Sequence, residues 1–312
     1  MDEESTRAVD EPGTGHVDGV WLAGCQRISL ALAGNRLTRW LWLPLGRRLR
    51  QFWAGRVGRE QPARLFGNQR IQAHLGEQID AGIFWFGFPP EDRPALEALV
   101  ATLPPDAVVL DVGANIGAFA LPLAAAARRG VVHAFEPATA TVQRLRRHLQ
   151  LNGLDNVVVN HCAVSDRTGT LSLWIPADEW KGRLFNSGRT SVHVGRQQQG
   201  WQEESVPCLR LDDYVAGQSL QRVDAIKIDV EGAELDVLEG ARELLTRFRP
   251  VVVMELNAGP LRAAGRSVAD VLAFWRSLDY RVGMIAASGR VHWGRLPRDS
   301  QRHQNICCAP AA

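Results

Sequence analysis

"VVLDVGANIGAFALPLAAAA", residues 108–127, is the stretch of this sequence that decides the fold. Its aliphatic residues predict a strand, and its alanines and leucines predict a helix that follows a turn with two glycines, Gly113 and Gly117. In an open parallel sheet, ligands bind outside the carboxyl ends of the strands, where the strand order reverses. Glycines let the backbone approach a ligand closely, and the helix beyond offers unpaired N–H groups. We therefore predict a ligand at this turn.

Strand-like and helix-like segments alternate along the chain on both sides of this stretch. Strands are predicted over residues 107–112, 131–136, 156–164, 224–230, 250–256, 281–287 and 304–310. Helices are predicted over 91–103, 117–129, 139–153, 232–248 and 267–279. Shorter strand-like pieces precede them at 70–75 and 82–88. This alternation favours an α/β fold with a mostly parallel sheet and right-handed crossovers.

Two segments stand outside the alternation. Residues 1–62 begin with a polar stretch typical of disorder and continue with helical, basic signals, including an amphipathic run at 44–53. We expect that run to pack on the main domain, with a membrane-surface or partner-binding helix as the alternative. The loop 176–205 is too long for an ordinary connection, which makes it a candidate lid. Tryptophans give large contact areas, and this region carries Trp174, Trp180 and Trp201.

Composition narrows the class of protein. The chain has 312 residues, 46% of them hydrophobic, which is enough for a substantial core. A formal charge of +2 is too small to indicate a nucleic-acid partner, and the five scattered cysteines form no zinc-binding pattern. We expect no transmembrane helix and, because the polar start differs from a secretory signal, a cytoplasmic location. Only two of the 36 basic residues are lysines, so Lys227 is a candidate for a specific chemical role.

Acidic residues at two successive strand ends identify the ligand. Asp111 would place a carboxylate close to it, which repels a pyrophosphate but suits an ammonium group. Glu136 ends the next strand and can accept hydrogen bonds from both hydroxyls of a ribose. The turn has two glycines, Gly113 and Gly117, with Ala114 and Asn115 between them. It therefore lacks the third glycine of a dinucleotide fingerprint. These features together describe S-adenosylmethionine.

Three other groups complete the predicted site. Cys162 and Ala163, at the third strand end, would form an apolar wall for the adenine. Lys227, Asp229 and Glu231 alternate with aliphatic residues and would share one face if the extended geometry lasts. Methyl transfer to an alcohol needs positioning and a base, and Asp229 is the better base candidate. Lys227 would hold its charge state or orient the acceptor, and Glu231 would assist or bind substrate hydroxyls.

A structural interpretation of the same residues stays open. Asp229 or Glu231 could instead cap the helix that starts near Gly232, with Lys227 as a salt-bridge partner. Two acids without a third ligand do not define a metal site, so no metal is predicted.

Five segments resemble the FkbM family of S-adenosylmethionine-dependent methyltransferases. They are "VVLDVGANIGAFAL", "HAFEPATATVQRLRRHLQLNGLDNVVVNHCAVSD", "VPCLRLDDYV", "VDAIKIDVEGAELDVLEGARELL" and "RPVVVMEL", and the resemblance covers about residues 96–312. It implies a Rossmann-like, seven-stranded methyltransferase fold with a reversed final hairpin, S-adenosylmethionine as donor and usually O-methylation. It places the cofactor on Asp111, Gly113, Asn115, Gly117 and Glu136. Lys227, Asp229, Glu231 and Gly232 match its second signature.

From these observations we expect an N-terminal extension over residues 1–62 and a methyltransferase domain over 63–312, with its core at about 96–312. The predicted function is O-methylation of a hydroxyl on a small molecule, a sugar, a glycolipid or a polyketide. One alternative is a nicotinamide-dependent oxidoreductase. Another is a non-catalytic cofactor-binding module docked on a membrane or on a biosynthetic partner.

Overall fold

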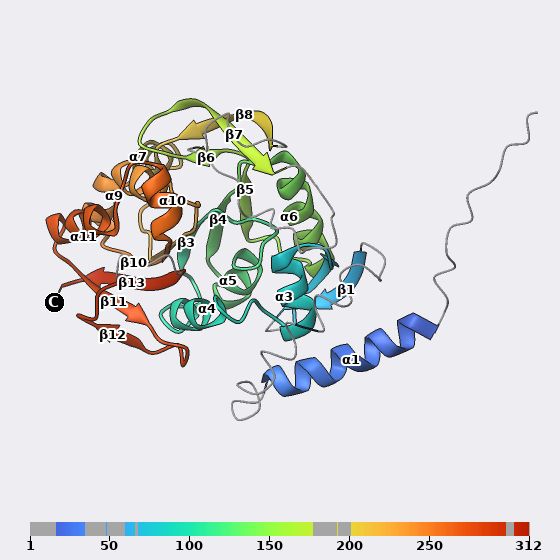
Figure 1. The fold of residues 1–312 in the computed structure, drawn as a ribbon. Helices are drawn as coiled ribbons and strands as arrows, with labels where there is room; N and C mark the ends of the chain where they lie inside the picture. Colours follow the sequence, from blue (N-terminus) through green and yellow to red (C-terminus); the bar gives the residue numbers. More distant parts are fainter. Residues whose placement is uncertain are drawn as a thin grey trace, which may run out of the picture.

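An eight-stranded sheet forms the centre of the protein in the computed structural model, which describes residues 17–34, 48, 60–65, 68–176, 192, 201–297 and 303–311. The strand order is β12-β11-β13-β10-β9-β3-β4-β5 (Figure 1). The strands are β3 (Val108–Val112), β4 (Val131–Phe135), β5 (Val157–Asn160), β9 (Ala225–Ile228), β10 (Val251–Leu256), β11 (Tyr280–Ile285), β12 (Val291–Trp293) and β13 (Gln304–Pro310). The predicted alternation of strands and helices is confirmed.

Most strand pairs of the large sheet are parallel. β3 runs parallel to β4 on one side and to β9 on the other, so the strand order reverses at β3. β13 runs antiparallel to both β10 and β11, as the predicted reversed hairpin requires. The sheet differs from the expected seven strands because the short β12 pairs with β11 and adds an eighth strand at the edge.

Helices cover both faces of this sheet (Figure 1). One face packs against α4 (Arg93–Val100), α5 (Ala120–Ala126) and α6 (Thr139–Asn152). The other packs against α7 (Leu211–Gly217), α8 (Glu234–Glu239), α9 (Arg242–Phe248), α10 (Ala258–Ala263) and α11 (Val268–Ser277). Because strand side chains alternate, Val109 joins the first hydrophobic core and Leu110 the second, as do Cys307 and Cys308. Burial on both faces explains why the strands are almost wholly aliphatic.

The N-terminal part of the described chain packs against α6 and the first core. It comprises α1 (Val17–Gly34), a hairpin of β1 (Glu60–Arg64) and β2 (Arg70–His74), and α3 (Gln78–Phe86). The Gln26 side chain donates a 3.3 Å hydrogen bond to the Phe84 carbonyl and so ties α1 to α3. The prediction of a strand over 82–88 was wrong, because most of this run belongs to α3. A short apolar run looks the same in a buried strand and in a buried helix.

The segment that interrupts the alternation begins and ends in strands. β6 (Ala163–Val164), β7 (Gly169–Pro176) and β8 (Trp201–Leu209) form a separate three-stranded sheet in the order β6-β8-β7. Trp174 and Trp201 therefore lie in paired strands. Of the predicted lid at 176–205, residues 177–191 and 193–200 lie outside the described residues, and so does Trp180. The first 16 residues and, except for Arg48, the amphipathic run at 44–53 also lie outside them.

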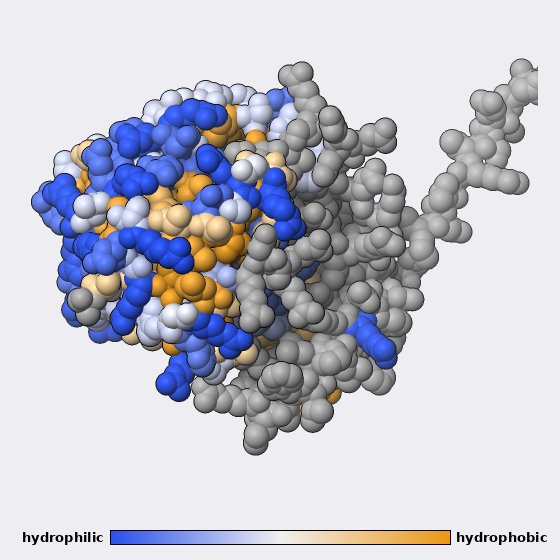
Figure 2. Space-filling view, turned by 60° about the vertical axis from the view of Figure 1, so that its left-hand side comes forward, coloured by the Kyte–Doolittle hydropathy of each residue, from blue (hydrophilic) through white to orange (hydrophobic). Residues whose placement is uncertain are grey.

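Figure 2 turns the carboxy-terminal elements towards the viewer, and hydrophobic residues there form a central area bordered by hydrophilic ones.

None of the helices in the described part of the chain combines the length and the apolar character needed to cross a membrane.

Candidate active site

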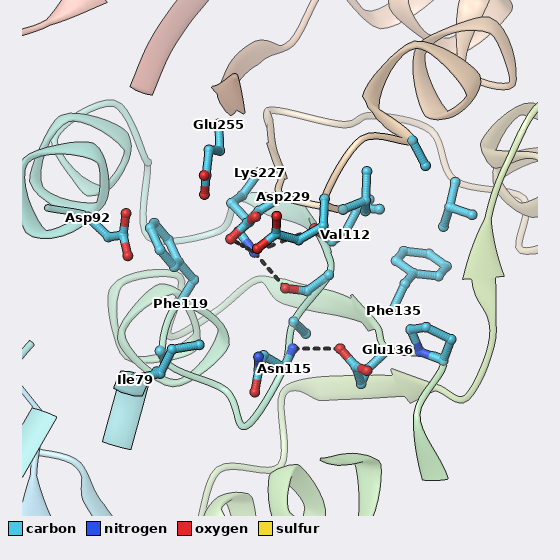
Figure 3. A pocket seen from close by; sticks show the side chains of 18 of the residues that line it. Ile79, Asp92, Val112, Asn115, Phe119, Phe135, Glu136, Lys227, Asp229 and Glu255 are labelled. Carbon is cyan, nitrogen blue, oxygen red and sulfur yellow. Dashed lines mark hydrogen bonds and ion pairs between the residues drawn. The ribbon is translucent and has the colours of Figure 1, made fainter. Parts of the chain in front are cut away.

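A cavity lies at the carboxyl ends of the central strands, where the strand order reverses. Its described lining includes nine of the predicted site residues, namely Gly113, Ala114, Asn115, Glu136, Cys162, Ala163, Lys227, Asp229 and Glu231. Figure 3 shows Asn115 and Glu136 on one side of this cavity and Lys227, Asp229 and Glu255 on the other. Residues from four strand ends therefore meet in one place, as the parallel sheet requires.

The glycine turn after β3 approaches the end of β9 closely. Gly113 has a φ of 75°, and a Cβ atom there would lie 1.9 Å from the Asp229 carbonyl oxygen. The Gly113 and Ala114 amides both donate to the Phe135 carbonyl, at 3.0 and 2.9 Å. The turn is thus held against β4 and β9 together, and only glycine fits at its first position.

Glu136 holds this turn from the end of β4. One carboxylate oxygen accepts a 2.9 Å hydrogen bond from the Asn115 amide (Figure 3). The other accepts a 3.0 Å bond from the Ala138 amide. The side chain lines the cavity, and burial raises the pKa of its carboxyl to about 7 despite these bonds. Each carboxylate oxygen keeps a further lone pair beyond the bond described for it.

Cys162 and Ala163 also line the cavity and are both buried. Burial raises the pKa of the Cys162 thiol to about 11, so this side chain is a neutral thiol at physiological pH. A neutral thiol behaves as a small apolar group. Both residues therefore offer apolar surface to the cavity, and their contact with an adenine stays a prediction.

Asp111 and Gly117 are absent from the described lining of the cavity. The Asp111 side chain is fully buried and faces β9, where Lys227 Nζ lies 3.5 Å from its Oδ1 atom. Burial raises the pKa of Asp111, while the nearby Lys227 opposes that effect. A Cβ atom on Gly117 would lie 2.2 Å from Leu121 Cδ1 and 2.7 Å from Leu145 Cδ1, so this glycine is needed for packing. Both residues therefore stabilise the turn through contacts outside the cavity, Asp111 with Lys227 and Gly117 with the packed leucines.

Lys227 joins the glycine turn to the predicted catalytic strand. Its ammonium group donates a 2.6 Å hydrogen bond to the Gly113 carbonyl and lies 3.6 Å from Asp229 Oδ2. Burial lowers the pKa of Lys227, but the charges of Asp111 and Asp229 outweigh it and the net pKa is raised. The group is therefore a buried ammonium between two acids and a carbonyl. A compact point charge fits this position, which explains a lysine here in a chain whose basic residues are nearly all arginine.

Replacing Lys227 with methionine is expected to lower the free energy of unfolding by about 3–5 kcal/mol, because Asp111 would keep a buried charge without a partner. Urea unfolding measures this change. Arg242→Met is the matched control, since its ion pair with Glu239 is exposed and should contribute less than about 1 kcal/mol. Equal losses in the two variants would show that the Lys227 and Asp111 charges do not depend on each other.

Asp229 and Glu231 both line the cavity, although the extended geometry does not reach them. β9 ends at Ile228, and Glu231 has a φ of 49° in the left-handed region. The alternative interpretation as helix caps is wrong, because the N-cap of α8 is Ala233 and makes no side-chain cap hydrogen bond. Its salt-bridge part is right, since Lys227 pairs with Asp229.

The cavity also contains three functional side chains that were not predicted, Asp92, Glu255 and His303. His303 Nε2 lies 3.0 Å from Asp92 Oδ1, and its Nδ1 lies 2.5 Å from Glu255 Oε1. Burial lowers the pKa of His303, but the two carboxylates outweigh it and raise the pKa to about 11. Glu255 is an acid near the carboxyl end of the strand β10, so the argument used for Asp111 and Glu136 could have found it. Asp92 and His303 lie in connections and carry no such signal.

Comparison with known proteins shows the family of this chain. A family model described as "Methyltransferase FkbM domain" matches residues 111–282, which is more than half of the chain. The protein is therefore a methyltransferase. It belongs to the FkbM methyltransferase family, and the predicted enzyme class, an S-adenosylmethionine-dependent methyltransferase, is confirmed.

Several relatives are similar to this chain over about half of its length or somewhat more. "Methyltransferase 1" of Beauveria bassiana is 31% identical over 207 residues, 60% of this chain and 83% of the relative. "2-O-methyltransferase NoeI" of Sinorhizobium fredii is 32% identical over 173 residues, 51% of this chain and 70% of the relative. "31-O-demethyl-FK506 methyltransferase FkbM" of Streptomyces tacrolimicus is 33% identical over 172 residues, 48% of this chain and 65% of the relative.

Proposed function

We propose that the protein is an O-methyltransferase that acts on a hydroxyl of a small molecule, in the class of sugars, glycolipids and polyketides. The observation that carries this proposal is one cavity with Glu136 on one side and the Lys227–Asp229 pair on the other. The names of two relatives specify methylation of an oxygen, at a 2-O position in one and in 31-O-demethyl-FK506 in the other. We also propose residues 63–312 as the methyltransferase domain and 1–62 as its extension.

The cofactor side is formed by residues that suit S-adenosylmethionine. Glu136 would accept hydrogen bonds from the ribose hydroxyls, and the turn from Gly113 to Asn115 would lie against the amino acid part. Cys162 and Ala163 would contact the adenine. Bound there, S-adenosylmethionine supplies an electrophilic methyl group on a sulfonium. Asp111 contributes indirectly, because its charge holds Lys227 and Lys227 holds the turn.

On the acceptor side, Asp229 is the proposed base. Its side chain is one-third exposed at 34%, while Asp111 on the other side of Lys227 is inaccessible. Attack of the acceptor oxygen on the methyl carbon would break the bond between that carbon and the sulfonium sulfur and release S-adenosylhomocysteine, while the hydroxyl proton passes to the Asp229 carboxylate. The Lys227 ammonium keeps that carboxylate in place. Glu231 lines the same cavity and would bind further hydroxyls of the acceptor.

Glu136→Gln is expected to weaken S-adenosylmethionine binding by about 10–100-fold, because an amide cannot accept at both oxygens as the carboxylate does. The wild-type affinity should fall as the pH is lowered through 7, since the pKa of Glu136 is raised to about 7 and the protonated carboxyl accepts less well. We expect about tenfold weaker binding at pH 6 than at pH 8. In the variant this dependence should disappear.

Isothermal titration calorimetry of S-adenosylmethionine and S-adenosylhomocysteine measures both effects. Glu239→Gln is the matched control, since it makes the same change at an exposed acid paired with Arg242. A folded wild-type protein that binds neither compound would overturn the proposed function. Wild-type binding that is equal at pH 6 and pH 8 would contradict the role of Glu136.

A further inference from the structure

Three potential metal ligands meet at the acceptor side of the cavity. Asp92 is the N-cap residue of α4, Glu255 lies in β10, and His303 immediately precedes β13. One ligand atom from each lies within 4.8 Å of the other two. All three line the cavity that also contains Asp229. Figure 3 shows the Asp92 and Glu255 side chains on the same side of the cavity as Asp229.

Negative charge exceeds positive charge among these described residues. Lys227 is shared between Asp111 and Asp229, at 3.5 and 3.6 Å. His303 is thus left to balance both Asp92 and Glu255, and it contacts each of them. A single imidazole ring is therefore the partner of two carboxyl groups. Carboxylates that are largely removed from water are costly unless they are paired or bind a metal ion.

We propose that Asp92, Glu255 and His303 bind a divalent first-row cation, Mn²⁺ or Zn²⁺. One histidine with two carboxylates suits these ions, whereas Mg²⁺ prefers oxygen ligands alone. Bonds of about 2.0–2.2 Å place adjacent ligands of one ion about 3–3.6 Å apart, so the three ligand atoms, which lie within 4.8 Å of one another, would draw closer on binding. His303 now lies between Asp92 and Glu255 with one carboxylate at each ring nitrogen, so its ring would turn and one nitrogen would bind the ion in place of its present contact.

The cation would take over the charge that the imidazolium now supplies, and His303 would release one proton to solvent on binding. Asn305 helps to hold Asp92 in place, because its Nδ2 atom donates a 3.3 Å hydrogen bond to Asp92 Oδ1. Three protein ligands leave coordination positions for oxygens of a bound molecule.

This cation gives the proposed function a substrate class, and that part of the inference rests on the proposed function. A cation beside Asp229 would bind the acceptor oxygen and a neighbouring oxygen and favour their deprotonation. Acceptors with two adjacent hydroxyls would therefore be preferred over those with an isolated hydroxyl. The proton that leaves the methylated oxygen still passes to Asp229.

The test is a titration of Mn²⁺ into chelator-treated full-length protein, followed by the electron paramagnetic resonance signal of the free ion. Wild type is expected to bind one Mn²⁺ per chain at this site, and Zn²⁺ is expected to compete for it. Glu255→Gln and His303→Gln should each weaken binding at least tenfold. Glu239→Gln, at an exposed acid, should leave it unchanged. Circular dichroism of each variant establishes that it is folded.

The inference is overturned if folded wild type binds neither Mn²⁺ nor Zn²⁺, or if both glutamine variants at the site bind as wild type does. His303 would then be only an imidazolium bridge between two acids. Calorimetry with S-adenosylmethionine on the same samples separates this failure from failure of the proposed function. Cofactor binding without metal binding rejects the cation site alone, and metal binding without cofactor binding rejects the methyltransferase proposal alone.

Discussion

Asp229→Asn is expected to lower the turnover number by about two to four orders of magnitude and to leave the affinity for S-adenosylmethionine within about twofold. Asparagine has nearly the same shape as aspartate but cannot take up the acceptor's proton. The Asp229 side chain lines the cavity and lies 3.6 Å from Lys227 Nζ. Lys227 keeps its contact with Asp111 in the variant, so the fold should be retained. Release of S-adenosylhomocysteine with a hydroxylated acceptor measures turnover, and calorimetry measures binding.

Asp213→Asn is the matched control for this prediction. Asp213 is also an acid that contacts a cation, Arg210, but its side chain is exposed and the described lining of the cavity does not include it. Its replacement should leave turnover within about twofold of wild type. If Asp229→Asn turns over as fast as this control, Asp229 is not the base.

Gly113→Ala is the second substitution with a large expected effect. An alanine Cβ would lie 1.9 Å from the Asp229 carbonyl oxygen, and the positive φ of 75° adds strain for any residue with a side chain. We expect the free energy of unfolding to fall by about 2–5 kcal/mol and cofactor binding to be lost, because the turn must move away from β9.

Gly153→Ala separates the two causes. Gly153 has a φ of 60°, but a Cβ atom there would meet nothing within 4 Å. Its replacement should cost about 1–2 kcal/mol, from the backbone conformation alone, and leave binding intact. Urea unfolding and calorimetry compare the two variants. A loss at Gly113 no larger than the loss at Gly153 would mean that the close approach to Asp229 does not matter.

The strand ends show how far reasoning from sequence reaches. Glu136 and Asp229 follow strands whose aliphatic pattern is plain, and both line the cavity. Asp111 satisfied the same rule, yet it pairs directly with Lys227 across β3 and β9. A central parallel strand is buried on both faces, so its sequence does not tell whether an acid near its end faces a ligand or a neighbouring strand.

The run 82–88 shows a second limit. Its apolar residues are equally compatible with a strand and with a buried helix. In the structure the run forms a helix that contacts α1 and packs in the first core. The sequence did predict the adjacent helix over 91–103, where the charged and apolar residues recur with helical period. Periodicity therefore decided the amphipathic elements and failed for the wholly apolar one.

The sequence by itself determined the order of strands and helices, the glycine turn after β3, the acid at the end of β4 and the family. These features depend on local patterns, because side-chain alternation and a positive φ are properties of a few consecutive residues. Only the tertiary structure decided that Lys227 lies between Asp111 and Asp229, and that Asp92, Glu255 and His303 share one side of the cavity. Asp111 and Lys227 are far apart along the chain, as are Asp92, Glu255 and His303, and the packing of strands and helices alone brings these side chains together.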